Sequence, residues 1–479
     1  MGHCLQILKR DAEVPNRIHR VQYEAVGTIE EVQVLPSLGK NSKPMQEAIE
    51  DCSSLQNLLH QKVPATFAND ITANMLVCID GIYKDIQKWI KEPWCSKILL
   101  ELVSAIIHPS ITELDLHYTL SFISKYLFAR LNTMTKLKEL KLYNLNDQTS
   151  EPLIIEGLYN MESLQVLTIH YHCSDSIVIA VGNKCTYLKS LDIAFSKSVT
   201  DASISSLLKL VHLEEIDLTD TCISGKGYMK LINEINCDVK NRLQKFGCSQ
   251  IQTTHMTVLL RDFPSLVEVN IRRYRHNSDH IASELKALKV LRLTDCRFQD
   301  VEELLLATGS HLIELELNKI KDFNVRVIGE KCLTVQKLTI NGYVRYVPQY
   351  EDDDVGLPGF QSLEHISLNL YRDYSFIAYI LSECKNLKQV DLFITDGSEQ
   401  ETEDTVEFIL SKNSMQCLEE FSIRTHMAGF LTQKIVMLLI ENCPNITVLR
   451  GVNTWSSIGN LEDYIEEMAE NYPNIHLSE

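Results

Sequence analysis

CTYLKSLDIAFSKSVTDASISSLLKL, residues 185–210, is the clearest copy of a unit that recurs along most of the chain. Apolar and polar residues alternate in its first half, which predicts a short strand that turns Leu188, Leu191 and Ile193 toward a core. From Ile204 onward the apolar residues follow the three- and four-residue spacing of a helix. Each repeat is therefore predicted to consist of a strand, a turn and a helix.

The first apolar position of this unit returns about every 26 residues between Ile111 and Ile475, a period typical of leucine-rich repeats. Such repeats stack into a solenoid in which each one contacts its neighbours. We therefore expect an α/β leucine-rich-repeat solenoid, a horseshoe with a concave parallel sheet and convex helices, over residues 109–479 in about 14–15 repeats. Two acidic stretches, residues 342–360 and 396–405, interrupt the rhythm and are predicted to be solvated loops.

A helical module is predicted before the repeats, at residues 46–108, where it would cap the open apolar end of the solenoid. Residues 1–45 mix charges and prolines with short apolar stretches, and we expect them to be poorly ordered. Three helices are predicted in the module from apolar periodicity. Their apolar positions are Ile49, Cys52, Leu55 and Leu59 in the first, Phe67, Ile71, Met75, Ile79, Ile82, Ile86 and Ile90 in the second, and residues 96–107 in the third.

Charge and cysteine usage restrict the class of partner. The net charge of −18 opposes binding to nucleic acid or to an anionic membrane, so we expect protein partners. None of the 14 cysteines forms a C-x-x-C pair, and four of them precede apolar anchors as small core residues would: Cys185, Cys332, Cys384 and Cys443. The apolar run before Lys9 is too short for a signal peptide, so we expect a cytoplasmic or nuclear protein.

Catalytic and metal-binding motifs are missing from the sequence. It contains no G-x-S-x-G, H-E-x-x-H or P-loop pattern, so we expect neither an enzyme nor a bound cofactor. His170 and His172 would share one face of a strand beside Cys173, but no fourth ligand is near, and we expect surface histidines rather than a metal site. We interpret His276 and His280 in the same way, and the acidic run 351–354 as a charged loop.

The unit at residues 185–210 resembles the cysteine-containing leucine-rich repeat common in F-box substrate receptors. Ser196 stands where that repeat usually has cysteine, and V-T-D at 199–201 stands where I-T-D is frequent. Cys296 in LTDCRF occupies the same position in a second copy. The resemblance covers about residues 110–479 and implies the fold more specifically than it implies a function.

The segment SLQNLLHQKV, residues 54–63, is similar to the elongin-binding (VHL) box, S-L-x-x-x-C-x-x-x-V, with Leu59 in place of the cysteine. VPATFANDI, residues 63–71, is similar to a cullin-contact box but follows without a spacer. Alternatively, Val63-Pro64 with the later Trp89 resembles an F-box, although the tryptophan comes too early. A purely structural capping helix would need the same leucines. The adaptor contacts implied by the resemblance are Ser54, Leu55, Leu58, Leu59, Val63, Pro64 and Phe67.

Both boxes occur in substrate receptors of cullin-RING ubiquitin ligases, so the resemblance implies a non-catalytic receptor of SCF-like or elongin type. It would bind the SCF adaptor, or elongin B/C, together with a cullin, and hold a protein target on its concave face. The alternative is a free-standing scaffold or inhibitor that binds a protein without a ligase.

The concave side should present the polar positions that flank the inward leucines. Arg272, Arg273, Arg275 and Arg292 would form a basic patch there, and we expect charge reversal at Arg272 and Arg292 to abolish partner capture with little loss of stability. The predicted partner-binding residues are Tyr143, His170, Asp192, Asp217, Asn270, Arg272, Arg292, Glu316, Asn341 and Arg424.

Overall fold

The computed structural model describes residues 43–86, 93–116, 123–143, 150–277, 287–321, 324–342, 360–370, 374–395, 399–425, 432–451 and 461–478. Of the segment 1–45 that was predicted to be poorly ordered, residues 1–42 fall outside these ranges, whereas residues 43–45 form the start of a helix and correct that prediction. Most of the loop 342–360 with its acidic run, and the residues Trp89, Ile90 and His280, also fall outside. The chain forms two compact units, a first unit of residues 1–213 and a second unit of residues 214–479.

The first unit begins with three helices. They are α2 (Lys43–Lys62), α3 (Ala68–Ile86) and α4 (Pro93–Ile106), and a short 3-10 turn, η1 (Ala65–Phe67), precedes α3. Helix α2 packs mainly along α4, and α3 contacts the first strand, β1 (Glu113–Leu116). The side chain of Asn69 in α3 accepts hydrogen bonds from the backbone amides of Thr112 and Glu113 at 3.0 and 3.2 Å. The helical module is therefore joined directly to the first repeat.

In its first turns, the buried face of α3 is offset by one residue from the predicted one, whereas Ile79 further along is buried as predicted. Ala68, Thr72 and Leu76 are buried, whereas Phe67 is exposed and Ile71 is only half-buried. The helix begins after the 3-10 turn, and the Thr72 hydroxyl donates to the Ile106 carbonyl oxygen of α4 at 3.2 Å. A polar residue that satisfies its own hydrogen bond thus occupies a core position that hydrophobic periodicity alone did not identify.

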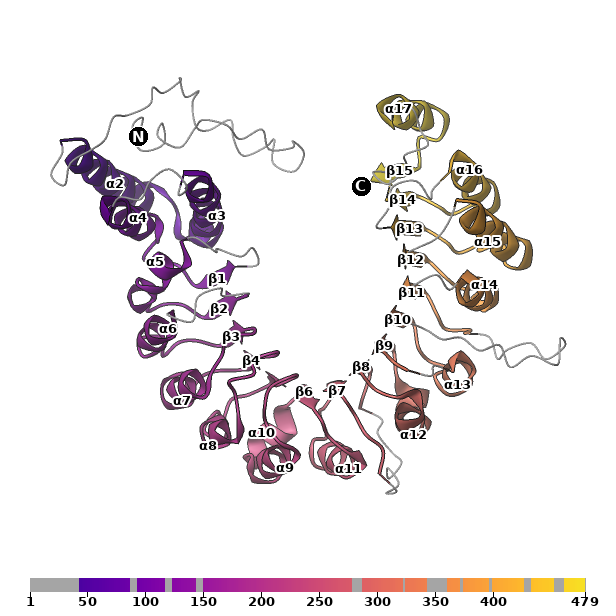
Figure 1. The fold of residues 1–479 in the computed structure, drawn as a ribbon, viewed down its shortest axis with the longest axis horizontal. Coiled ribbons are helices and arrows are strands. Elements are labelled where there is room, and N and C mark those ends of the chain that lie inside the picture. Colours follow the sequence, from indigo (N-terminus) through magenta and orange to yellow (C-terminus); the bar gives the residue numbers. More distant parts are fainter. Residues whose placement is uncertain are drawn as a thin grey trace. The chain divides into compact units, whose positions relative to one another are not determined.

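The repeats of the first unit place four parallel strands on the concave side and helices on the convex side (Figure 1). In the copy at 185–210, Leu188, Leu191 and Ile193 are buried as predicted. Strands β1 to β4 pair in register, with Leu140 opposite Leu114 and Leu167. The further strands are β2 (Glu139–Leu142), β3 (Val166–Ile169) and β4 (Ser190–Asp192). The helices are α5 (Ser124–Phe128), η2 (Leu131–Thr133), α6 (Glu151–Leu158), α7 (Asp175–Lys184), η4 (Asp201–Ser203) and α8 (Ile204–Leu207).

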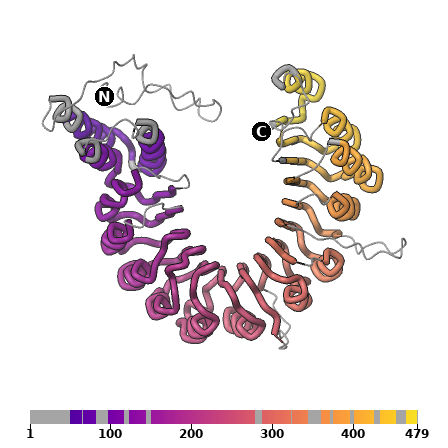
Figure 2. The backbone as a smooth tube through the Cα atoms, in the orientation of Figure 1, coloured from indigo at the N-terminus to yellow at the C-terminus, as the bar shows by residue number. Residues whose placement is uncertain are grey.

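The second unit repeats the same coil, which can be followed along the backbone in Figure 2. Its parallel strands also lie on the concave side and follow one another in chain order. They are β5 (Glu215–Asp217), β6 (Lys245–Ser249), β7 (Glu268–Arg272), β8 (Val290–Thr294), β9 (Glu314–Asn318), β10 (Lys337–Gly342), β11 (His365–Leu370), β12 (Gln389–Ile394), β13 (Glu420–Thr425), β14 (Val448–Arg450) and β15 (His476–Ser478).

Helices follow the strands in most repeats of the second unit, as the predicted order of strand, turn and helix requires. They are α9 (Gly225–Glu234), α10 (Cys237–Arg242), α11 (Thr253–Asp262), α12 (Phe298–Thr308), η5 (Gly309–His311), α13 (Val325–Lys331), α14 (Tyr374–Glu383), α15 (Glu399–Lys412), α16 (Gln433–Asn442) and α17 (Leu461–Asn471). The loop predicted at 396–405 is wrong from Glu399 onward, because α15 begins there. Thr402 of α15 is buried, and its hydroxyl lies 3.0 Å from the Tyr374 hydroxyl of α14.

Each unit is therefore a leucine-rich-repeat solenoid of the α/β class, and its core consists of the aligned leucines between sheet and helices. The four cysteines that precede repeat anchors, Cys185, Cys332, Cys384 and Cys443, are buried as predicted. Burial raises the pKa of the Cys185 thiol to about 12, so the thiolate form needed for reactivity is disfavoured. No helix among the described residues is long and apolar enough to cross a lipid bilayer.

Candidate binding surface

The strand register brings the predicted polar positions to the face of the sheet opposite the leucines. In β8, for example, Arg292 lies between the buried Leu291 and Leu293, opposite Asn270 of β7 and Glu316 of β9. Nine of the ten predicted positions are at least partly exposed on this face of their own unit: Tyr143, His170, Asp192, Asn270, Arg272, Arg292, Glu316, Asn341 and Arg424.

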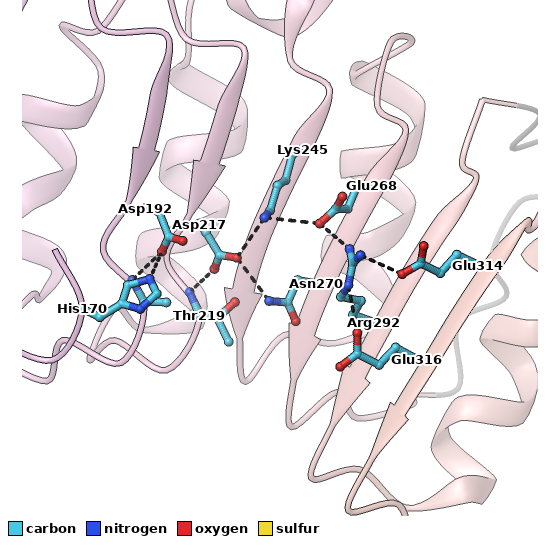
Figure 3. A network of polar contacts seen from close by, with 11 residues as sticks. His170, Asp192, Asp217, Thr219, Lys245, Glu268, Asn270, Arg292, Glu314 and Glu316 are labelled. Atoms are coloured by element: carbon cyan, nitrogen blue, oxygen red, sulfur yellow. Dashed lines mark hydrogen bonds and ion pairs between the residues drawn. The ribbon is translucent and has the colours of Figure 1, made fainter. Parts of the chain in front are cut away.

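Arg292 is enclosed by carboxylates of the two neighbouring strands (Figure 3). Its Nη1 lies 2.5 Å from Glu268, its Nη2 2.8 Å from Glu314, and its Nε 3.0 Å from Glu316. Burial alone would lower the pKa of Arg292, but the three carboxylates outweigh burial and raise it. The guanidinium is therefore held by the protein itself and is not a free cation for a partner.

The predicted basic patch is likewise neutralised within the second unit. Arg272 Nη1 donates to Asp220 at 2.8 Å, and Arg273 Nε donates to Asp295 at 3.0 Å. Together with Arg292, three of the four arginines are thus paired with carboxylates, whereas Arg275 is exposed. These ion pairs change what is expected of charge reversal at Arg272 and Arg292: it should lower stability, because it would set carboxylates against carboxylates in partly buried sites.

Asp217 was predicted to be a surface residue and is instead 5% exposed. Its carboxylate accepts from the Thr219 backbone amide at 2.9 Å and from the Asn270 side chain at 3.2 Å (Figure 3). It lies over Gly247 of β6, where an added Cβ would be 2.1 Å from Asp217 Oδ1. The glycine provides the space for this carboxylate, so Asp217 acts as a structural link between three strands.

The later strands of the second unit carry polar pairs. Asn341 donates to the Asn318 side chain at 2.6 Å, and Arg424 Nη2 contacts both carboxylate oxygens of Asp391 at 2.8 and 3.0 Å. Both members of the Arg424–Asp391 pair keep solvent exposure, so this pair is accessible to a partner.

Aromatic side chains gather at the carboxyl ends of β2, β3 and β4 in the first unit. Tyr143 and His170 are edge-to-face at 5.1 Å between ring centroids, and Tyr171 stacks on Phe195 at 5.2 Å with an interplanar angle of 17°. His170 also lies edge-to-face against Phe195 at 6.0 Å. Its Nε2 is 2.9 Å from Asp192 Oδ1 (Figure 3). We call Tyr143, His170, Tyr171 and Phe195 the ring cluster.

Sequence reasoning identified Tyr143 and His170 but missed Tyr171 and Phe195. Both missed residues have left-handed backbones, with φ of 68° and 64°. The sequence did contain one indication of these residues: both are aromatic and follow a strand in successive repeats, where the chain has to turn. Strand alternation does not extend into that turn and could not predict which way their side chains point.

The same turn separates the three residues considered for a metal site. Strand β3 ends at Ile169, so His170 and His172 do not share a strand face as assumed. Cys173 is buried, and burial strongly raises the pKa of its thiol. Among the described residues, no group of three His, Cys, Asp or Glu side chains is arranged to hold a metal ion.

In the helical module, the residues of the predicted adaptor contact divide between core and surface. Leu59 is 8% exposed and packs inside the module, so little of its side chain is available for the adaptor contact that the resemblance implies. Leu58 and Phe67 are 39% and 55% exposed although both are apolar. Of the remaining predicted contacts, Ser54 and Pro64 are exposed and Leu55 and Val63 are half-buried.

When the chain is compared with known proteins, similar chains are found among solved structures. No protein-family model matches the sequence, and no curated protein matches it significantly. A chain of the Rad7–Elc1 complex in yeast is 15% identical, with 84% of this chain and 97% of that chain covered and a TM-score of 0.40. An internalin (inlF) from Listeria monocytogenes is 14% identical, with coverages of 86% and 96% and a TM-score of 0.32. TLR13 in complex with ssRNA13 is 13% identical, with coverages of 78% and 65% and a TM-score of 0.29. The fold assignment accordingly depends on the repeat geometry described above.

Proposed function

We propose that this protein is a non-catalytic substrate-recognition subunit of a cullin-RING ubiquitin ligase. In this proposal a protein target binds the concave side of the repeats, and the helical module docks an adaptor, either the SCF adaptor or elongin B/C, with a cullin. The protein would hold its target beside the ligase and so raise the effective concentration of the target without doing chemistry itself. This activity would take place in the cytoplasm or the nucleus.

The observation that carries the adaptor part is the exposure of apolar side chains in the box-like segment. Leu58 near the end of α2 and Phe67 in the following turn remain in solvent, whereas Leu59 and Cys52 of α2 are in the core. An amphipathic helix that keeps apolar residues outside its own core has the chemistry needed to enter an adaptor groove.

A free-standing scaffold or inhibitor is the second candidate, and the joint between module and repeats favours it. His60 Nε2 lies 2.9 Å from the Ile107 carbonyl oxygen, and Asn69 accepts from the Thr112 amide. These contacts explain α2 and α3 as a structural cap that needs no adaptor. The two functions share the protein-binding concave face and differ only in whether the module has a partner.

A binding assay with purified adaptors separates the two candidates. The full chain is titrated with the SCF adaptor and, separately, with elongin B/C, each with its cullin. If the proposal holds, one adaptor binds, and Leu58→Asp or Phe67→Asp weakens it by about tenfold or more, because a charge cannot enter an apolar groove. The matched control is Leu306→Asp on α12, which changes an apolar residue that is 49% exposed outside the module.

Binding of neither adaptor to the wild-type chain would reject the ligase proposal and leave the scaffold. Equal loss of binding in Leu306→Asp would reject the module as the docking site. Thermal unfolding of each variant checks that the exposed substitutions leave the fold intact.

A further inference from the structure

Tyr171 and Phe195 occupy backbone positions that do not favour aromatic residues. The left-handed region is strained for side chains with a Cβ and is most easily occupied by glycine or asparagine. Other repeats place small or polar residues at the left-handed position that follows a strand: Asp220, Gln250, Arg273, Asp295, Lys319 and Gly342. Among the described strand ends, Tyr171 and Phe195 are therefore exceptions, because they place aromatic residues at this left-handed position.

Folding alone does not explain these two rings. Tyr171 is 52% exposed, so its ring gains little from burial, and Phe195 is only half-buried. The stacking of the two rings offsets part of the backbone strain, but a glycine at each position would remove the strain altogether. Residues held in strained conformations at a solvent-exposed site are typical of ligand contacts.

Carboxylates occupy concave positions of the strands that lead to the ring cluster. The concave positions of β1, β2 and β4 carry Glu113, Asp115, Glu139 and Asp192, and the facing cation in these strands is Lys141. Lys141 Nζ contacts Glu139 and lies 3.5 Å from Asp115 Oδ2. Burial raises the pKa of Tyr143, and the negative charges of Asp115, Asp192 and Glu139 raise it further, against the opposing effect of Lys141. The net field at the rings is negative and would attract a cation.

We propose that the ring cluster binds an arginine or lysine side chain from a basic segment of a protein partner. Ring faces attract a cation placed over them, and Asp115 and Asp192 supply carboxylates for its charged nitrogen atoms. Arginine fits better than lysine, because its planar guanidinium stacks on an aromatic face and pairs with a carboxylate at the same time. This inference rests on the proposed protein-binding function and specifies the chemistry that the first unit would recognise.

The test is a selection of random peptides on the full chain, followed by affinity measurements with one selected peptide. We expect enrichment of peptides that contain arginine or lysine. Tyr171→Gly and Phe195→Gly should each weaken the selected peptide by about tenfold or more, the size of effect typical of aromatic hot spots. Exchange of its arginine for citrulline, which is neutral and nearly isosteric, should do the same. Asp115→Asn should weaken binding less and reduce its dependence on salt concentration.

Gln250→Gly is the matched control. Gln250 has the same left-handed backbone, with φ of 56°, and is an exposed neutral residue at the end of β6. Its substitution should leave peptide affinity unchanged. Thermal unfolding should show that Tyr171→Gly and Phe195→Gly are as stable as the wild type or more stable, since glycine relieves the strain. A loss of affinity in these variants then reports the rings and not misfolding.

Three outcomes would overturn the inference: enrichment of peptides without basic residues, affinity that both glycine variants retain, or no enrichment at all. These outcomes are distinguishable from failure of the proposed function. If a captured partner depends on Arg424 and not on the ring cluster, the protein-binding function stands and the inference falls. If an adaptor binds the helical module but no selected peptide depends on the ring cluster, the ligase proposal stands and only the inference about the ring cluster falls.

Discussion

Arg292 sits on the sheet face with one carboxylate from β7 and two from β9 within 3.0 Å of its guanidinium nitrogens. The same face carries Asp217, held by Asn270 and the Thr219 amide. Both residues connect strands of different repeats through side chains, in addition to the backbone ladder. Charge on this face of the second unit therefore contributes to the alignment of the repeats as well as to any recognition of a partner.

Replacement of Arg292 by leucine should destabilise the protein by about 1–3 kcal/mol, because Glu268, Glu314 and Glu316 would face one another without a cation. The figure is lower than for a fully buried pair, since the Arg292 side chain is 26% exposed. Denaturant unfolding measures the change. Arg326→Leu is the control, because Arg326 on α13 pairs with Glu330 four residues along an exposed helix face and should change stability by less than about 0.5 kcal/mol. Equal effects of the two substitutions would show that the Arg292 network is not structural.

The sequence pattern did not predict the ion pair of Arg272 or the burial of Asp217. Alternation in the strand correctly placed Arg272 on the sheet face, but its partner Asp220 is 52 residues away. The space for Asp217 depends on Gly247 in the next strand. Such pairings depend on how strands of different repeats align, and a pattern within one repeat contains no information on that alignment. Periodicity therefore predicted the leucine core and the face of each strand, but not which charges are already paired.

At the scale of elements, the joint between the helical module and the first repeat combines polar contacts with two histidine rings. The rings of His60 on α2 and His108 after α4 meet edge-to-face at 5.5 Å between centroids. His108 is buried, and its Nδ1 accepts from the Ser110 backbone amide at 3.1 Å. Protonation of His108 would place a donor where that acceptor is needed. The joint is thus built around a neutral imidazole.

This neutral imidazole makes the joint sensitive to mild acid. Burial lowers the pKa of His108 below its ordinary 6.5, and electrostatic repulsion by the neighbouring His60 lowers it further, although the Val63 backbone opposes the shift. Between the folded and unfolded pKa values the unfolded chain binds more protons, so the free energy of unfolding falls as pH drops below about 6.5. Thermal unfolding of the wild type should show a lower midpoint at pH 5.5 than at pH 7.5.

The control for this prediction is His108→Asn, whose side-chain oxygen can replace Nδ1 as acceptor for the Ser110 amide but does not titrate. The drop in midpoint between the two pH values should be smaller in this variant than in the wild type. A drop of the same size in both proteins would assign the acid sensitivity to other groups.

At the scale of the whole molecule, stability should be local, because each repeat in a solenoid packs on its neighbours and not on distant repeats. The chain divides into two compact units, and the described strand pairings join strands of neighbouring repeats, as for β2 with β3 and β3 with β4. A defect in one repeat should therefore spread to adjacent repeats and fade along the chain, unlike a defect in a domain with a single shared core.

Leu191→Ala tests this locality. Leu191 in β4 is 1% exposed and lies opposite Leu167 of β3, so its truncation should cost about 2–5 kcal/mol. Hydrogen exchange measured on the full chain should show lost amide protection in β3, β4, α7 and α8, and unchanged protection in β11 to β13. Leu392→Ala in β12, where the side chain is equally buried, is the reciprocal control and should produce the opposite distribution. Each substitution thus serves as the control for the other at a distant repeat. If either one lowers amide protection uniformly along the chain, the repeats unfold as one cooperative body, and the nearest-neighbour description is contradicted.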